Sequence, residues 1–123
     1  MSYTGQTAGT TAGIKKENVN RAFNELKQGL YEYRYDFADG EYGRLMSSTS
    51  LGDFLVKIGV TGKVTKQGNF TNLSYDGFYL DGGYEAFIYM LQKCGHGKIK
   101  ILAEDATVYV YDFNKHTQKS YHV

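Results

Sequence analysis

The stretch from Lys98 to Phe113, KIKILAEDATVYVYDF, constrains the fold more than any other part of the chain. Two alternating runs flank a short acidic turn, which predicts an antiparallel β-hairpin. Successive side chains of a strand point to opposite faces. We expect one face to be purely aliphatic, with Ile99, Ile101, Val108 and Val110. We expect the other face to be basic and aromatic, with Lys98, Lys100, Tyr109, Tyr111 and Phe113.

The aliphatic face of this hairpin belongs to the core, and the basic and aromatic face has three interpretations. Its rings are buried if the chain's long first helix covers them. If they are exposed, they form a docking surface for a protein partner, because tyrosine serves interfaces without requiring net positive charge. Alternatively, the rings stack on the bases of single-stranded nucleic acid while the lysines hold phosphates.

The helical part of the pattern begins at residue 14. An apolar stripe predicts a long N-terminal helix over residues 14–37, formed by Val19, Phe23, Leu26, Leu30, Tyr33 and Phe37. Thr11 is its expected N-cap, and Gly29 is expected to mark a bend. Residues 41–49 are predicted to be a loop.

Two shorter helices follow, each with capping signals. Ser50 caps the helix that runs to Ile58, and Asp81 caps the helix that runs to Cys94 and ends at Gly95. Strands are predicted at residues 60–66, 69–75 and 117–122 in addition to the hairpin at 98–113. The fold class is therefore α+β: a long N-terminal helix and two shorter helices packed on a mainly antiparallel sheet of about five strands.

The first 13 residues, MSYTGQTAGTTAG, have no periodicity, and their composition is typical of a flexible arm. We therefore predict an N-terminal arm at 1–13 and a single α+β domain at 14–123. The arm is ordered by its own domain, by a neighbouring copy or by a different partner.

Composition places the chain among ordinary soluble domains. Its 123 residues carry a net charge of +1, which argues against steering to DNA by bulk charge. No apolar run approaches the roughly 20 residues of a membrane helix. One cysteine cannot form an intramolecular disulfide, which favours a reducing, cytoplasmic setting. The 12 tyrosines, without any tryptophan or proline, suit either an interface or a tyrosine-lined core.

Few residues suggest chemistry. Cys94 and His96 are close in sequence, but zinc usually takes three or four ligands and no second pair occurs, so no metal or cofactor is predicted. Cys94 would end a helix, where the dipole opposes a thiolate. Gly82 and Gly83 open a helix and are a candidate anion site, although no phosphate-loop motif is present.

These observations predict a non-enzymatic binding protein. It would dock on a protein partner through the Tyr/Lys face and the N-terminal arm, either as an accessory or inhibitory protein of a phage or mobile element or as a self-assembling subunit. One alternative is a single-stranded nucleic-acid-binding protein. Another is sequestration of a small anionic, nucleotide-like ligand at Gly82 and Gly83 with Lys98 or Lys100.

Overall fold

The computed structural model describes residues 3–123, and this part of the chain forms two antiparallel sheets and four α-helices. In chain order the elements are β1 (Gly5–Thr10), α1 (Val19–Glu32), α2 (Glu41–Met46), α3 (Leu51–Lys57), β2 (Val60–Val64), β3 (Phe70–Tyr75), α4 (Gly82–Cys94), β4 (Lys98–Ala103), β5 (Thr107–Asp112) and β6 (Thr117–His122). The larger sheet has the order β1-β4-β5-β6, and β2 and β3 form the smaller one. The predicted α+β class is confirmed, with six described strands rather than about five. No helix within residues 3–123 is long and apolar enough to span a bilayer.

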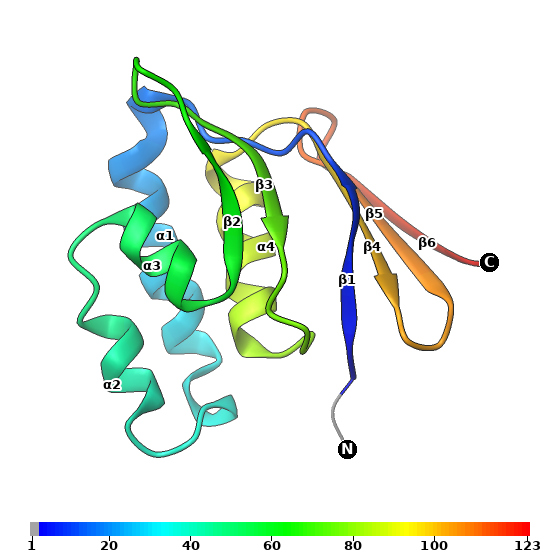
Figure 1. Ribbon diagram of the computed structural model, residues 1–123, viewed down its shortest axis with the longest axis horizontal. Helices are drawn as coiled ribbons and strands as arrows, with labels where there is room; N and C mark the ends of the chain where they lie inside the picture. Colours follow the sequence, from blue (N-terminus) through cyan, green and yellow to red (C-terminus); the bar gives the residue numbers. More distant parts are fainter. Residues whose placement is uncertain (1–2) are drawn as a thin grey trace.

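Helix α4 is the centre of the molecule (Figure 1). Its residues are buried on nearly all sides, and the Phe87 and Tyr84 rings pack against Tyr75 of β3. On its other side α4 packs against α1, where a Cβ added to Gly29 would lie 3.1 Å from the Cα of Ala86. A helix that is apolar all round is buried, whereas an amphipathic helix such as α1 forms an outer layer. The expectation that the first helix covers the sheet is therefore wrong.

Helix α1 is shorter than the predicted span of 14–37. A 3-10 turn at Lys16–Asn18 precedes it, and another at Arg34–Asp36 follows it. Thr11 is not its N-cap, because the Thr11 hydroxyl accepts a hydrogen bond from the Lys98 backbone N–H at 3.0 Å. Gly29 marks the close approach to α4 rather than a bend. Tertiary contacts, which periodicity does not report, decide these boundaries.

Other local predictions are confirmed at the level of individual hydrogen bonds. The Ser50 hydroxyl accepts from the Asp53 N–H at 3.1 Å, and the Asp81 carboxylate accepts from the Gly83 N–H at 3.0 Å. The predicted hairpin over residues 60–75 and the last strand are present as β2, β3 and β6. The predicted loop at 41–49 is wrong, because it contains α2, in which Arg44 forms an ion pair with Glu41 at 2.7 Å.

The N-terminal segment does not stand apart from the domain. Residues 5–10 form β1, which pairs antiparallel with β4 of the same chain, so the chain's own domain orders this segment. The predicted arm also includes residues 1 and 2, which lie outside the described residues. A bulge between Thr7 and Gly9 shifts the register, which places the Thr7 and Thr10 side chains on the same side of the strand.

Threonine hydroxyls join the two sheets. The Thr7 hydroxyl donates to the carbonyl of Tyr75 at 3.1 Å and accepts from the N–H of Tyr75 at 2.8 Å. The Thr10 hydroxyl donates to the carbonyl of Leu73 at 2.7 Å, and the Leu73 N–H donates to the carbonyl of Ala12 at 2.9 Å. These side chains take the place of a backbone ladder between β1 and β3.

Candidate interaction surface

The β4–β5 hairpin is present, but its register differs from the prediction. Ile99 lies opposite Tyr111, and Ile101 lies opposite Tyr109. Residues opposite one another on neighbouring strands point to the same face. The predicted division into an aliphatic face and a basic, aromatic face is therefore wrong: the tyrosines share a face with the isoleucines, and the lysines share a face with the valines.

The length of the turn causes this difference. Glu104, Asp105 and Ala106 form a three-residue connection, whereas the predicted faces require a connection with an even number of residues. Ala106 has φ 65°, the left-handed conformation that ends such a turn. A change of one residue in turn length moves every side chain of a strand to the other face.

We expect Ala106→Gly to stabilise the protein. Ala106 is exposed and pays the steric cost of a left-handed residue, about 1–2 kcal/mol, which glycine avoids. Part of that gain is offset by the larger entropy of glycine in the unfolded chain, so we expect a net increase of about 0.5–1 kcal/mol in the free energy of unfolding. Urea denaturation measures it. A decrease would contradict the turn geometry. Gln67→Gly is the control, because Gln67 is an exposed turn residue without a positive φ.

The three aromatic residues of the predicted surface lie against the core. Tyr111 is 8% exposed and Phe113 is 3% exposed, and their rings stack with centroids 6.2 Å apart. The Tyr111 hydroxyl lies 3.0 Å from that of Tyr84 on α4, and burial raises the pKa of Tyr111. Tyr109 is half-buried, with its hydroxyl 3.1 Å from that of Tyr3. A partner molecule therefore has no access to the Tyr111 and Phe113 rings.

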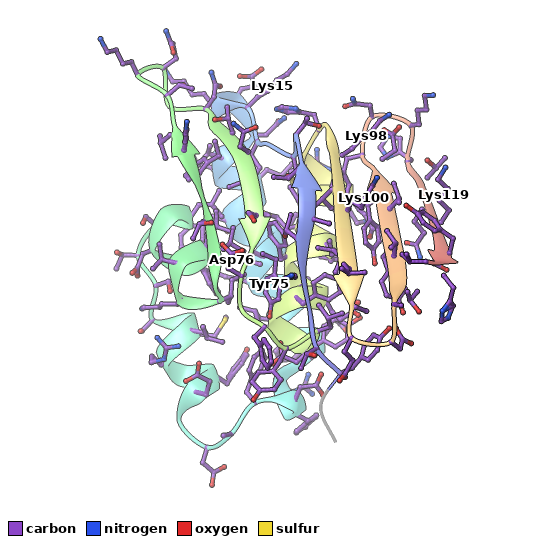
Figure 2. The ribbon with its side chains drawn as sticks, turned by 45° about the vertical axis from the view of Figure 1, so that its right-hand side comes forward. Lys15, Tyr75, Asp76, Lys98, Lys100 and Lys119 are labelled. Carbon is purple, nitrogen blue, oxygen red and sulfur yellow. The ribbon has the colours of Figure 1, made fainter. Side chains whose placement is uncertain are left out.

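Lys98 and Lys100 lie on the other face of the larger sheet, which we call the open sheet face. Figure 2 shows them beside Lys119 on the sheet, with the yellow-green helix α4 behind it. We define this face by the exposed and half-buried residues Gln6, Lys98, Lys100, Leu102, Val110, Lys119 and Tyr121, together with the buried Val108 and Asp112. No helix within residues 3–123 covers it.

Cross-strand pairing arranges the open sheet face in rows. Val110 lies between Lys100 on β4 and Lys119 on β6, so two ammonium groups flank an aliphatic side chain. The next row is apolar, because Val108 lies between Leu102 and Tyr121. Neighbouring strands are about 4.8 Å apart, so the Lys100 and Lys119 backbones are separated by about 10 Å. The face therefore presents a basic strip beside an apolar strip.

A hollow of about 240 Å³ lies between β1 and these lysines. It exists because β1 contributes the small residues Ala8 and Gly9, and no atom lies within 4 Å of a Cβ added to Gly9. Lys98 and Lys100 line its other side. Lys98 is 62% exposed and has a carboxylate, Asp112, at 3.7 Å. The hollow is thus a shallow concavity with cations on its rim.

Charge is segregated between the two ends of the sheet. Four segments meet at the end where β4 begins, as shown by hydrogen bonds from Gly13 N–H to the His96 carbonyl, from Lys16 N–H to Asn69 Oδ1 and from Gly97 N–H to Asn114 Oδ1. Their ionisable residues are Lys15, Lys16, Glu17, Lys66, His96, Lys98, Asp112, Lys115 and His116. We call this the basic end.

The opposite end of the sheet is acidic. There the Thr4 N–H donates to Glu104 at 3.0 Å, the Gly5 N–H donates to the Phe78 carbonyl at 2.9 Å and Tyr3 donates to Asp105 at 2.7 Å. The acidic residues at this end are Asp36, Asp39, Glu41, Asp76, Asp81, Glu104 and Asp105, and the basic residues Arg34, Arg44 and Lys57 lie among them. Acidic residues outnumber basic ones here, so a net charge near zero conceals a charge asymmetry.

Gly82 and Gly83, the predicted anion site, are buried in acidic surroundings. The Asp81 carboxylate accepts from the Gly83 N–H, and a Cβ on Gly82 would lie 3.2 Å from Asp36 Oδ2. Burial and the Asp36 carboxylate raise the pKa of Glu85 in the same helix turn. The carboxylates of Asp81 and Asp36 thus lie at the helix end where an anion was expected to bind. The structure does not bring Lys98 or Lys100 to it, because both lie on the open sheet face.

Sequence reasoning missed a groove of about 510 Å³ between α3 and the β2–β3 hairpin. Its lining is mainly apolar and includes Leu55, Val56, Val60, Val64, Phe70 and Leu73. Gly52 and Gly62 both line the groove; a Cβ on Gly52 would reach the Phe70 ring at 3.9 Å, and the absence of a Cβ on Gly62 allows the close approach of Leu73. The exposed valines of α3 and β2 were the available signal, but only the packing of α3 against the hairpin brings them together.

Cys94 is buried, and burial raises the pKa of its thiol. Among residues 3–123, His, Cys, Asp and Glu side chains do not gather in a group of three that could hold a metal ion. Comparison of the chain with family models, with curated proteins and with solved structures gave no match.

Proposed function

We propose that the protein is a non-catalytic binding protein that engages an acidic protein surface through its open sheet face. The observation that carries this proposal is the arrangement of Lys98, Lys100 and Lys119 around Val110 on a sheet face without a helical cover. This surface includes Lys98 and Lys100, as expected from the sequence. Its apolar residues are Leu102, Val108 and Tyr121 rather than the aromatic residues that were expected.

The chemistry of this face defines the partner. Ammonium groups on flexible stems donate to carboxylates in many geometries. The adjoining row offers apolar surface from which water is displaced when a partner binds. Tyr121, which is 46% exposed, presents both a ring and a hydroxyl. A protein segment with carboxylates beside apolar side chains matches both rows. The acidic end lies at the opposite end of the sheet from these lysines, and Asp112, 3.7 Å from Lys98, is a carboxylate that partly offsets their charge.

The rest of the chain supports a non-catalytic role. Burial raises the pKa of Tyr75, Tyr84 and Tyr111, and the hydroxyls of these residues hold structural hydrogen bonds in the core. A cytoplasmic location is part of the proposal, because Cys94 is a free thiol. An accessory or inhibitory role in a phage or mobile element is the setting in which we place such a protein.

Single-stranded nucleic acid is the second candidate partner. The lysines of the open sheet face continue into Lys15, Lys16, Lys66 and Lys115 of the basic end, which favours phosphate contacts. Tyr121 would be the residue that stacks on bases, because the Tyr111 and Phe113 rings, which were first expected to do so, are buried. This loss of a stacking platform is why an acidic protein surface is the first candidate. A small nucleotide-like anion is not favoured by the carboxylates around Gly82 and Gly83.

Combined substitution of Lys98, Lys100 and Lys119 by glutamine tests the proposal. Fluorescein-labelled poly-L-glutamate serves as the acidic polypeptide probe and a thymidine oligonucleotide as the nucleic-acid probe. We expect the variant to bind poly-L-glutamate about tenfold more weakly, since each exposed ion pair contributes roughly 0.2–1 kcal/mol. Fluorescence anisotropy at 50 mM and 200 mM salt measures the affinity, which should fall as salt rises.

The matched control replaces Lys27, Lys57 and Lys93, which lie on α1, α3 and α4, by glutamine. It removes the same charge from the helical layers and should leave binding unchanged. Equal losses in the two triple variants, or no binding to either probe at 50 mM salt, would reject the open sheet face as the binding surface. Tighter binding to the oligonucleotide than to poly-L-glutamate would favour the second candidate.

A further inference from the structure

Strand β6 is an uncovered edge of the larger sheet. All of its residues are exposed, and in Figure 1 no other element lies beyond it. It pairs with β5 through the register Val108↔Tyr121 and Val110↔Lys119. Unpaired backbone groups on such an edge are a template for another strand. The sequence TQKSYH contains neither proline nor glycine to interrupt pairing.

One hydrogen bond shows which backbone groups of β6 remain free. The Val123 N–H donates to the Ala106 carbonyl at 2.9 Å. In an antiparallel ladder, alternate residues bond to the same neighbour. Odd-numbered residues of β6 therefore bond to β5. The N–H and C=O groups of Gln118, Ser120 and His122 point to the free edge.

We propose that two copies of this chain form a dimer through antiparallel pairing of their β6 strands, with Ser120 opposite Ser120 of the second copy. A two-fold axis through this pair keeps both open sheet faces on the same side. The result is one continuous sheet of both copies. The proposal is independent of which partner the open sheet face binds.

Backbone bonding favours this register over its neighbours. With Ser120 opposite Ser120, Gln118 lies opposite His122, so every free-edge residue is paired and about six backbone hydrogen bonds form. Shifting the centre to Lys119 or to Tyr121 leaves a free-edge residue unpaired in each copy and reduces the number to about four. A register that pairs an even-numbered residue of one β6 strand with an odd-numbered residue of the other would place the two open sheet faces on opposite sides of the sheet.

Side chains favour the same register. Lys119 then lies opposite Tyr121 of the second copy, where an ammonium group contacts an aromatic ring. Centring the pair on Lys119 would instead place two lysines directly opposite each other, which is destabilising. In the dimer the basic strip of each copy therefore continues into the apolar strip of the other, because Lys119 and Tyr121 lie next to the seam and face each other across it.

Sedimentation equilibrium from 5 µM to 1 mM tests the dimer. We expect the fraction of dimer to rise with concentration and to be lost in Ser120→Pro. Proline removes the Ser120 N–H, which points to the free edge and makes no bond to β5, so the fold of the monomer is kept. Ser120→Thr retains the N–H and is the matched control, which should dimerise like the unaltered chain. Circular dichroism confirms that both variants fold.

A cysteine placed at the axis reports the register. In Ser120→Cys the two Cα atoms would be about 5.5 Å apart, within the range that a disulfide spans. In Gln118→Cys they would be about 14 Å apart. In glutathione buffer we expect a disulfide-linked dimer only for Ser120→Cys, because the native Cys94 is buried. A monomer at 1 mM, a dimer unaffected by Ser120→Pro, or equal cross-linking at both positions would overturn the proposal.

Discussion

Replacing Phe87 by alanine is expected to lower the free energy of unfolding by about 3–5 kcal/mol. Phe87 has no exposed surface and lies on α4, where its ring packs against Tyr75 of β3. The substitution leaves a cavity at the contact between helix and sheet, and neighbouring elements fill it only in part. Urea denaturation followed by circular dichroism measures the loss. We expect a lower midpoint with little change in the denaturant slope.

Two control variants distinguish loss of core packing from a general effect of shortening an apolar side chain. Phe87→Leu keeps most of the volume and should cost far less than alanine. Val56→Ala on α3 removes an apolar side chain that is 72% exposed and should change stability by less than about 0.5 kcal/mol. A loss below about 1 kcal/mol for Phe87→Ala would mean that α4 does not form the central layer.

Thr7→Val is expected to cost roughly 2–4 kcal/mol, although threonine and valine have nearly the same shape. The Thr7 hydroxyl bonds to both the N–H and the C=O of Tyr75, a residue that is 2% exposed. Valine leaves both backbone groups unpaired, and each buried unpaired group costs about 1–3 kcal/mol. The same substitution should speed amide hydrogen exchange at Tyr75, because its N–H loses its acceptor.

Thr7→Ser is the matched control, since it keeps the hydroxyl and should retain the slow exchange of the Tyr75 amide. Gln6→Val, on the open sheet face of the same strand, should have little effect on stability. If Thr7→Val and Thr7→Ser were equally stable, the hydroxyl bridge would not hold β1 to β3. The smaller sheet would then depend on the remaining hydrogen bonds of Thr10, Ala12 and Ile14 to β3 and on its contacts with the helices.

The threonine bridge also bears on the proposed function. Strand β1 forms one wall of the hollow beside Lys98 and Lys100, and its pairing with β4 and its hydroxyl bonds to β3 hold that wall in place. A segment with the composition of a flexible arm is thus a structural part of the candidate surface. Weakening it should lower the affinity for poly-L-glutamate along with the stability.

Local signals in the sequence were sufficient where short-range chemistry decides structure. Ser50 and Asp81 cap their helices because their side-chain oxygens reach backbone N–H groups within the next turn. The alternation over 98–113 is sufficient to predict two paired strands. The α+β class follows from these elements, and it was predicted correctly.

The candidate site was predicted only in part. Lys98 and Lys100 are exposed, as expected, but Tyr111 and Phe113 are buried because a three-residue turn pairs Ile99 with Tyr111. The left-handed conformation of Ala106, which ends this turn, carries no strong sequence signal. Lys119 was missed, because its place beside Val110 follows from the pairing of β5 with β6.

By itself, the sequence determined the capped helices and the hairpins, because each depends on residues close together in the chain. Tertiary structure alone decided which helix covers the sheet, which face of the hairpin remains open and that the first strand is held by hydroxyl groups. Those outcomes depend on the register between strands and on packing between distant segments. A shift of one residue in the register of the β4–β5 hairpin exchanges its two faces while leaving every local pattern intact.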